Sequence, residues 1–382
     1  MRTSVFITFL IIIFLNIGCN SKEKESIIKD LDFRVQQIDT LFQHKLKEDK
    51  FHGGVVISKK GEILYENYFG IADRSLNIPM RRNMKFDIAS VNKSMIAGLV
   101  LKAVENKLLN LEDKLVDLLS DFKYSGQFDS EITLHQMLCH RSGLPDYDSV
   151  SLELKENGFL KFKRLRFTNE EYVDFISQLK PVSKPNQKFY YSNFAYHLIA
   201  IILETAYNKP FNEVLKENLT VPLGLKHTVS ESRNENIIPS LVKAYTYDVQ
   251  HKNWQITPYI DLSLGRRIFS TPSDLNKWAQ VMSNPGWLSQ SSLKLMLQNY
   301  QEKTSNVSYG YGWFVVDEEH KSKIGNLEIT QPYIIHGGST DGYKAMLINI
   351  NNQEFVMSFL SNVGNRTNEM KLAQEIVKIL IQ

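Results

Sequence analysis

The sequence predicts an α/β (α+β) protein: an antiparallel sheet built from both chain ends and flanked by helices, plus a mostly helical lobe. Three observations support this prediction. Runs rich in β-branched and aromatic residues occur early, in "GGVVISKKGEILYENYFG", where Lys60-Gly61 predicts a hairpin turn. Such runs return late, in "YIIHGG", "YKAMLINI" and "QEFVMSFLSN". Helical patterns dominate residues 90–225 between them. Helical segments at 27–47 and 368–381 can cover the sheet.

Length and charge limit the class of protein. The chain has 382 residues, enough for two packed lobes. Its net charge of +3 is small and the two signs are interspersed, so no nucleic-acid footprint stands out. We expect a body of residues 31–382, with an α/β lobe from about 31–85 and 265–382 and a helical lobe from about 86–264.

The N-terminus has the composition of an export signal. The apolar run Val5–Gly18 is short for a transmembrane helix and suits a signal-peptide core. It ends in "LNIGC", which resembles a bacterial lipoprotein cleavage box, although Asn16 stands where such boxes usually have leucine. We expect residues 1–18 to be the signal, Cys19 to carry lipid and 19–30 to be a charged spacer. The alternative is an uncleaved anchor; both predict a protein tethered to the bacterial membrane, periplasmic or at the cell surface.

Cysteine and histidine spacing argues against a disulfide or a metal site. If Cys19 is lipidated, only Cys139 remains, and its helical context "HQMLCH" predicts a small core residue. His135 and His140 lie five apart without an H-E-x-x-H arrangement, so zinc is not expected. We expect His135 to face solvent or a neighbouring helix, and His197 to be a hydrogen-bonded core or interface residue.

The stretch "DIASVNKSMIAGLVLKAVEN" carries the first candidate for chemistry. Ser90 and Lys93 are three apart at the start of a long amphipathic helix, so their side chains share one face. The helix N-terminus favours developing negative charge at Ser90. Lys93, partly desolvated near that positive end, should lose affinity for its proton and accept the Ser90 proton. The alternative is an N-cap serine followed by a surface lysine.

The stretch "KFYYSNFAYHLIAIILE" carries the second candidate. Tyr191 precedes an apolar helix, and a phenol held near a lysine ammonium ionises more easily and acts as a general base. The amide of Asn193 offers a donor and an acceptor for a substrate amide or ester. The alternative has Ser192 or Asn193 capping the helix while Tyr191 packs.

The stretch "YIIHGGSTDGY" carries the third candidate, a histidine at a strand end followed by two glycines. Glycines let a backbone come close to a ligand. A strand-edge N–H, paired with the N–H of Ser90, would form an oxyanion hole. The alternative is a loop histidine at a turn.

Together, S-V-N-K, Y-S-N and H-G-G resemble the motif set of the serine β-lactamase-like and penicillin-binding-protein-like family, in its class C branch of carboxypeptidases, esterases and D-aminopeptidases. The stretches "ITLHQMLCHRSGLPDY", "STPSDLNKWAQVM" and "YGYGW" resemble that branch's framework. The second of these also predicts the start of a helix, with Ser273 or Thr271 as its cap. The resemblance runs from about Phe51 to the C-terminus. It implies a β-lactamase/transpeptidase-like fold and a reaction that needs no metal or other cofactor.

The resemblance also implies a role for each motif residue. Ser90 is the nucleophile that accepts the acyl group, and Lys93 and Tyr191 share general acid–base duty. The backbone N–H groups of Ser90 and Ser339 form the oxyanion hole. The remaining motif residues bind substrate: Asn193, His336, Gly337 and Gly338.

Two departures from the usual pattern affect the expected specificity. His336 stands where β-lactamases and carboxypeptidases usually carry a lysine, and histidine is mostly neutral at pH 7. Arg266 and Arg267 stand where relatives often have small residues. One of these arginines is a candidate for binding a substrate carboxylate, and the alternative is two solvated loop cations.

These observations favour an exported serine hydrolase acting on esters or D-amino-acid-containing peptides. A D,D-carboxypeptidase or β-lactamase, acting on peptidoglycan fragments or β-lactams, is the first alternative. A binding lipoprotein that keeps the fold without catalysis is the second.

Overall fold

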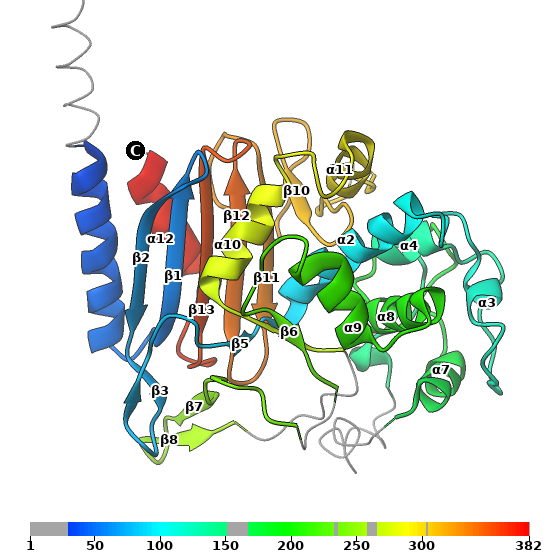
Figure 1. Ribbon diagram of the computed structural model, residues 1–382, viewed down its shortest axis with the longest axis horizontal. Coiled ribbons are helices and arrows are strands. Elements are labelled where there is room, and N and C mark those ends of the chain that lie inside the picture. Colours follow the sequence, from blue (N-terminus) through cyan, green and yellow to red (C-terminus); the bar gives the residue numbers. More distant parts are fainter. Residues whose placement is uncertain (1–29, 151–166, 233–235, 258–265, 303–304, 382) are drawn as a thin grey trace, which may run out of the picture.

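The computed structural model describes residues 30–150, 167–232, 236–257, 266–302 and 305–381 (Figure 1). The predicted signal segment and Cys19 lie outside these ranges. No helix among the described residues is long and apolar enough to cross a membrane.

The described strands include a six-stranded antiparallel sheet in the order β10-β11-β12-β13-β1-β2. The turn between the two N-terminal strands has Lys60 and Gly61 at φ 50° and 89°, as a two-residue hairpin requires. This confirms the predicted hairpin and the predicted assembly of one sheet from both chain ends. The strands are β1 (Gly53–Lys59), β2 (Glu62–Phe69), β10 (Phe314–Val316), β11 (Tyr333–Ser339), β12 (Lys344–Ile350) and β13 (Phe355–Ser361).

Alternation along the strands divides the core into two layers. In β13, Met357 and Phe359 pack in the layer beneath the helix of residues 30–47 and α12 (Glu369–Ile381). Val356 and Leu360 point the other way, into the core shared with α10 (Pro272–Val281) and the helical lobe. Figure 1 shows the terminal helices on one side of the sheet and that lobe on the other.

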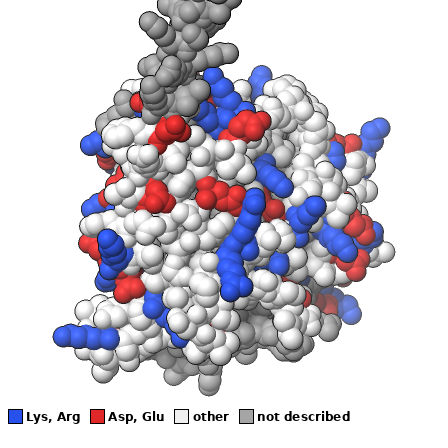
Figure 2. All heavy atoms as spheres, turned by 60° about the vertical axis from the view of Figure 1, so that its left-hand side comes forward, with Lys and Arg blue, Asp and Glu red and all other residues white. Residues whose placement is uncertain are grey.

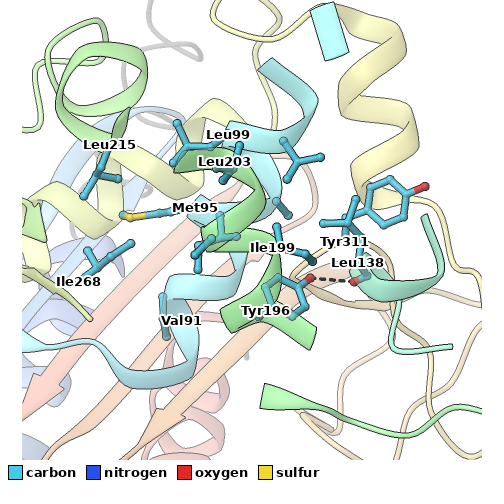
Figure 3. Close-up of a cluster of buried hydrophobic side chains, with 14 of the residues drawn as sticks. Val91, Met95, Leu99, Leu138, Tyr196, Ile199, Leu203, Leu215, Ile268 and Tyr311 are labelled. Carbon is cyan, nitrogen blue, oxygen red and sulfur yellow. Dashed lines mark hydrogen bonds between the residues drawn. The ribbon is translucent and has the colours of Figure 1, made fainter. Parts of the chain in front are cut away.

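The helical lobe is organised around two buried helices, α2 (Asn92–Glu105) and α8 (Asn193–Tyr207). Figure 3 shows Met95 and Leu99 of α2 beside Ile199 and Leu203 of α8, with the Tyr196 hydroxyl donating to the Leu138 carbonyl at 2.7 Å. Burying a side chain of this size contributes about 1.5–3 kcal/mol. The remaining elements of the lobe are α3 (Leu115–Leu118), α4 (Leu134–Leu138), η2 (Tyr147–Ser149), α7 (Asn169–Ser177), α9 (Phe211–Leu215) and η3 (Lys216–Thr220).

Short strands and one more helix complete the fold. β9 (Ile268–Ser270) pairs with β5 (Phe86–Asp87) and β6 (Val229–Ser230), where the chain passes between the predicted lobes. The other elements are β3 (Ile71–Asp73), β4 (Ile78–Pro79), β7 (Tyr245–Asp248), β8 (Asn253–Ile256) and α11 (Gln290–Leu297).

Local capping explains where two helices begin. The Thr271 hydroxyl accepts from the N–H of Asp274 and Pro272 follows as the first helical residue of α10, which confirms Thr271 as the cap. Ser192 caps α8 in the same way, through Ala195 at 3.0 Å. Cys139 is free and fully buried, as predicted. Figure 2 shows Lys and Arg interspersed with Asp and Glu over the visible face, in line with the small net charge.

Candidate active site

Ser90 lies in the short 3-10 turn η1 (Ala89–Val91), directly before α2. The preceding Ala89 has φ 48°, in the left-handed region that non-glycine residues seldom adopt. Its N–H donates to Asp87 Oδ1 at 2.8 Å, which holds the backbone in this conformation. The turn therefore presents a partly exposed Ser90 at the N-terminal end of a buried helix.

Lys93 lies one turn further on and is only 3% exposed. Its Nζ is 3.2 Å from Ser90 Oγ and donates to Asn193 Oδ1 at 2.8 Å. Burial lowers the pKa of Lys93 to about 7, against the opposing pull of the Asp146 carboxylate. This confirms the prediction that Lys93 loses affinity for its proton, and an amine with this pKa becomes increasingly neutral as the pH rises through 7.

Tyr191 reaches the same place from the residue before the α8 cap. Its ring centroid lies 4.9 Å from Lys93 Nζ, and its hydroxyl hydrogen-bonds with the Ser90 side chain. Burial raises the pKa of this phenol, so the prediction that Lys93 eases its ionisation is wrong. Lys93, with its pKa of about 7, is already neutral at the pH where a tyrosine ionises, and so supplies no positive charge.

Asn193 is the first residue of α8, and its carboxamide is held on both sides. Oδ1 accepts from Lys93, while Nδ2 donates to Asp146 Oδ2 at 2.9 Å. The backbone N–H of Asn193 donates to Asp146 Oδ1 at 3.1 Å. Asp146 was not among the predicted site residues. The available signal was its place in "SGLPDY", within a stretch that resembles the family framework.

The third motif forms a strand edge beside the Ser90 turn. β10 pairs only with Tyr333–Ile335, so among the described strands no partner covers that edge of β11 from His336 to Ser339. A Cβ on Gly338 would lie 2.3 Å from the carbonyl oxygen of Ile88. Only glycine therefore lets β11 lie this close to η1.

His336 is a buried, neutral residue of this strand, 2% exposed. Its Nδ1 donates to the Gly337 carbonyl at 2.7 Å, which leaves Nε2 to accept from the Tyr309 hydroxyl at 3.2 Å. Burial and the nearby Lys93 lower the pKa of His336 to about 3. The position that usually carries a lysine thus carries no positive charge at neutral pH, as predicted.

Arg266 and Arg267 both meet carboxylates of this chain. Arg266 pairs with Glu204 at 2.9 Å and also bonds Asn169. Arg267 pairs with Asp87, the residue that holds Ala89 in place. The structure therefore gives Arg267 a role in supporting the Ser90 turn, and carboxylate binding by either arginine stays a prediction.

Three other histidines are hydrogen-bonded structural residues. His135 Nδ1 lies 2.6 Å from the Tyr311 hydroxyl and His197 bonds the Tyr172 hydroxyl. His140 is fully buried and accepts from the Ser192 N–H at 3.2 Å, and its ring lies tilted against that of Tyr191 with 4.3 Å between the centroids. Within the described ranges, no group of three or more His, Cys, Asp or Glu side chains could hold a metal ion.

The fold and site together define a hydrolytic enzyme of the serine hydrolase class, one of those with a β-lactamase/transpeptidase-like fold. The family model Beta-lactamase matches residues 38–380, and the chain belongs to that family. The chain is 26% identical over 343 residues to penicillin-binding protein 4* of Bacillus subtilis, covering 86% of this chain and 71% of that one.

Two solved structures share the fold. EstCE1, described as a hydrolase with promiscuous acyltransferase activity, matches with a TM-score of 0.74 at 19% identity, over 93% of this chain and 99% of its own. A D-amino acid amidase from Ochrobactrum anthropi SV3 matches with a TM-score of 0.71 at 20% identity, over 92% and 98%.

Proposed function

We propose that this enzyme hydrolyses esters or D-amino-acid-containing peptides through an acyl-enzyme on Ser90. The observation that carries the proposal is the 3.2 Å contact between Lys93 Nζ and Ser90 Oγ, made by a buried lysine whose pKa is about 7. A neutral amine at this distance can take the hydroxyl proton as the serine attacks.

The reaction starts when Ser90 Oγ bonds to the substrate carbonyl carbon and its proton passes to Lys93 Nζ. Negative charge develops on the carbonyl oxygen, where the backbone N–H groups of Ser90 and Ser339 would stabilise it. Tyr191 is hydrogen-bonded to Ser90 and stays protonated, so it serves as a relay that delivers a proton to the leaving group and regains one from Lys93. Water then attacks the acyl-enzyme by the same steps in reverse and releases the acid.

The preference for esters and D-amino acid derivatives is supported by the neutral third motif. With the pKa of His336 near 3, that strand offers no fixed cation for the carboxylate that β-lactams and D,D-peptides carry. The structural neighbours named as a hydrolase with acyltransferase activity and as a D-amino acid amidase fit this preference. D,D-carboxypeptidase or β-lactamase activity is the second candidate, favoured by the similarity to penicillin-binding protein 4*.

Export and lipid anchoring at Cys19 belong to the same proposal. They are supported by the apolar run Val5–Gly18, which ends directly before Cys19 in "LNIGC". Metabolic labelling with a palmitate analogue, with Cys19→Ala as control, tests the anchor. Label that persists in Cys19→Ala would contradict it.

A substrate panel tests the proposed activity. Purified wild-type and Ser90→Ala proteins are compared on p-nitrophenyl acetate, a D-alanine p-nitroanilide, a D-Ala-D-Ala peptide and a chromogenic cephalosporin. We expect Ser90-dependent turnover of the first two to exceed that of the others. Turnover of none of the four would favour a binding lipoprotein without catalysis, and turnover led by the cephalosporin would favour a β-lactamase.

A further inference from the structure

The loop before η2 is hydrogen-bonded to the N-terminus of α8. The Ser192 hydroxyl donates to the Pro145 carbonyl at 2.6 Å while also capping α8. The carboxylate of the next residue, Asp146, accepts hydrogen bonds from the backbone and the side-chain N–H of Asn193, at 3.1 and 2.9 Å. A third donor, the N–H of Tyr147, also reaches this carboxylate. Three N–H donors suit an ionised carboxylate, although burial raises the pKa of Asp146.

These contacts determine which end of the Asn193 carboxamide faces Lys93. With Nδ2 held by Asp146, Oδ1 must point to Lys93, where it accepts at 2.8 Å. A neutral amine has two N–H donors and one lone pair. When Oδ1 takes one donor, the lone pair stays available to the Ser90 hydroxyl. If the carboxamide were turned over, Nδ2 would donate to that lone pair and block the proton acceptor.

We propose that Asp146 is a positioning residue, which acts through Asn193 to keep the Lys93 lone pair directed at Ser90. This inference rests on the proposed acyl transfer at Ser90. It assigns a function to a residue outside the three motifs.

Asp146 also interacts electrostatically with Lys93. Burial lowers the pKa of each of the three histidines that interact with Lys93, so these are neutral at pH 7. The Asp146 carboxylate acts against the effect of burial on Lys93 and raises the pKa of Lys93. Within the part of the chain that the structure describes, the titratable side chains that face Lys93 include Asp146 on this loop, His140 after α4, Tyr191 before α8, Tyr196 and His197 on α8, and His336 on β11.

The test uses Asp146→Asn in the full-length protein, with p-nitrophenyl acetate as substrate. We expect the plateau of kcat/KM to fall roughly tenfold to a hundredfold, because the carboxamide is free to turn over. Loss of the carboxylate removes an attraction for the Lys93 ammonium, so the pKa of Lys93 falls. The rise of kcat/KM with pH on the acid side, the acid limb of the profile, therefore moves to lower pH by about one unit. A merely structural role would lower the plateau without moving the limb.

Asp148→Asn is the matched control. It makes the same charge change two residues away, on a carboxylate that bonds the exposed Tyr190 hydroxyl. We expect its plateau and acid limb to match the wild type.

A double-mutant cycle shows whether Asp146 acts through Asn193. In an Asn193→Ala background, Asp146→Asn should change the plateau less than twofold, because no carboxamide remains to be held. If the two substitutions lower kcat/KM by factors that multiply, the proposal is wrong. An acid limb of the pH profile that does not move in a folded Asp146→Asn protein would also overturn it. If Asp146→Asn does not fold, the same cycle is run with Asp146→Ser. Absence of any Ser90-dependent turnover in the wild type would instead count against the proposed function itself.

Discussion

Arg267 forms an ion pair with Asp87, the carboxylate that also accepts the N–H of Ala89 at 2.8 Å, one residue before Ser90. The guanidinium thus supports the left-handed turn that presents the candidate nucleophile. Asp87 is nearly fully buried, so removing its partner would leave an uncompensated charge.

Arg267→Ala is therefore expected to lower kcat for neutral esters roughly tenfold to a hundredfold, because the Ser90 turn loses its support. Steady-state kinetics on p-nitrophenyl acetate and on a carboxylate-bearing ester measure the effect. Arg266→Ala is the control, since Arg266 pairs with Glu204 instead. A rise in KM restricted to the carboxylate-bearing ester would show that Arg267 binds substrate.

The pKa of Lys93 predicts a pH profile. Below about pH 7 the amine is protonated and has no lone pair for the Ser90 proton, so kcat/KM on a neutral ester should rise with pH through about 7 and then level off. Lys93→Ala should lower the plateau by roughly 10²–10⁴. Lys102→Ala, on the same helix and paired with Glu105, is the control and should keep the wild-type profile. A profile flat through pH 7 would rule out Lys93 as the base.

His336 predicts how stability depends on pH. Its pKa is about 3 in the folded protein and near 6.5 when unfolded, so the unfolded state binds the proton first as pH falls. His336 therefore destabilises the fold increasingly as the pH falls from about 6.5 to below 3, by roughly 5 kcal/mol at the limit.

Denaturant unfolding of His336→Asn across this range should show a shallower loss of stability than the wild type. The exposed His44 provides the matched site, and the slope of His336→Asn is compared with that of His44→Asn as well as with the wild type. Identical slopes for His336→Asn and wild type would contradict the buried, neutral state of His336.

Gly338 predicts a steric effect. A Cβ there would meet the Ile88 carbonyl oxygen at 2.3 Å, a backbone atom that cannot swing away, so Gly338→Ala should cost about 1–3 kcal/mol of unfolding free energy. The neighbouring Gly337 has its nearest contact at 3.6 Å, from the flexible Met346 side chain. Thermal unfolding should therefore show a clear fall in Tm for Gly338→Ala and little change for Gly337→Ala. Equal Tm values would mean that β11 and η1 are not in close contact.

Local patterns were sufficient to predict the sheet, its hairpin and the α10 cap. Strand alternation, the Lys60-Gly61 turn and the Thr271 cap each depend on residues within a few positions of one another. The motifs also placed Ser90, Lys93 and Tyr191 together, but by resemblance and not by spacing alone.

The features that were missed depend on contacts between distant segments. Asp146 meets Asn193 across 47 residues, and Arg267 meets Asp87 across 180. Neither contact leaves a periodic or local pattern in the sequence. The error on Tyr191 has a related cause, because the depth of burial that raises its pKa is a property of the packed lobes.

Covalent labelling of Ser90 tests the central claim most directly. The wild-type protein and Ser90→Ala are treated with a fluorophosphonate, and the adduct is located by peptide mass spectrometry. We predict one adduct on Ser90 in the wild type and none in Ser90→Ala. A wild type that stays unlabelled at Ser90, or an adduct that persists in Ser90→Ala, would contradict the assignment of Ser90 as the nucleophile.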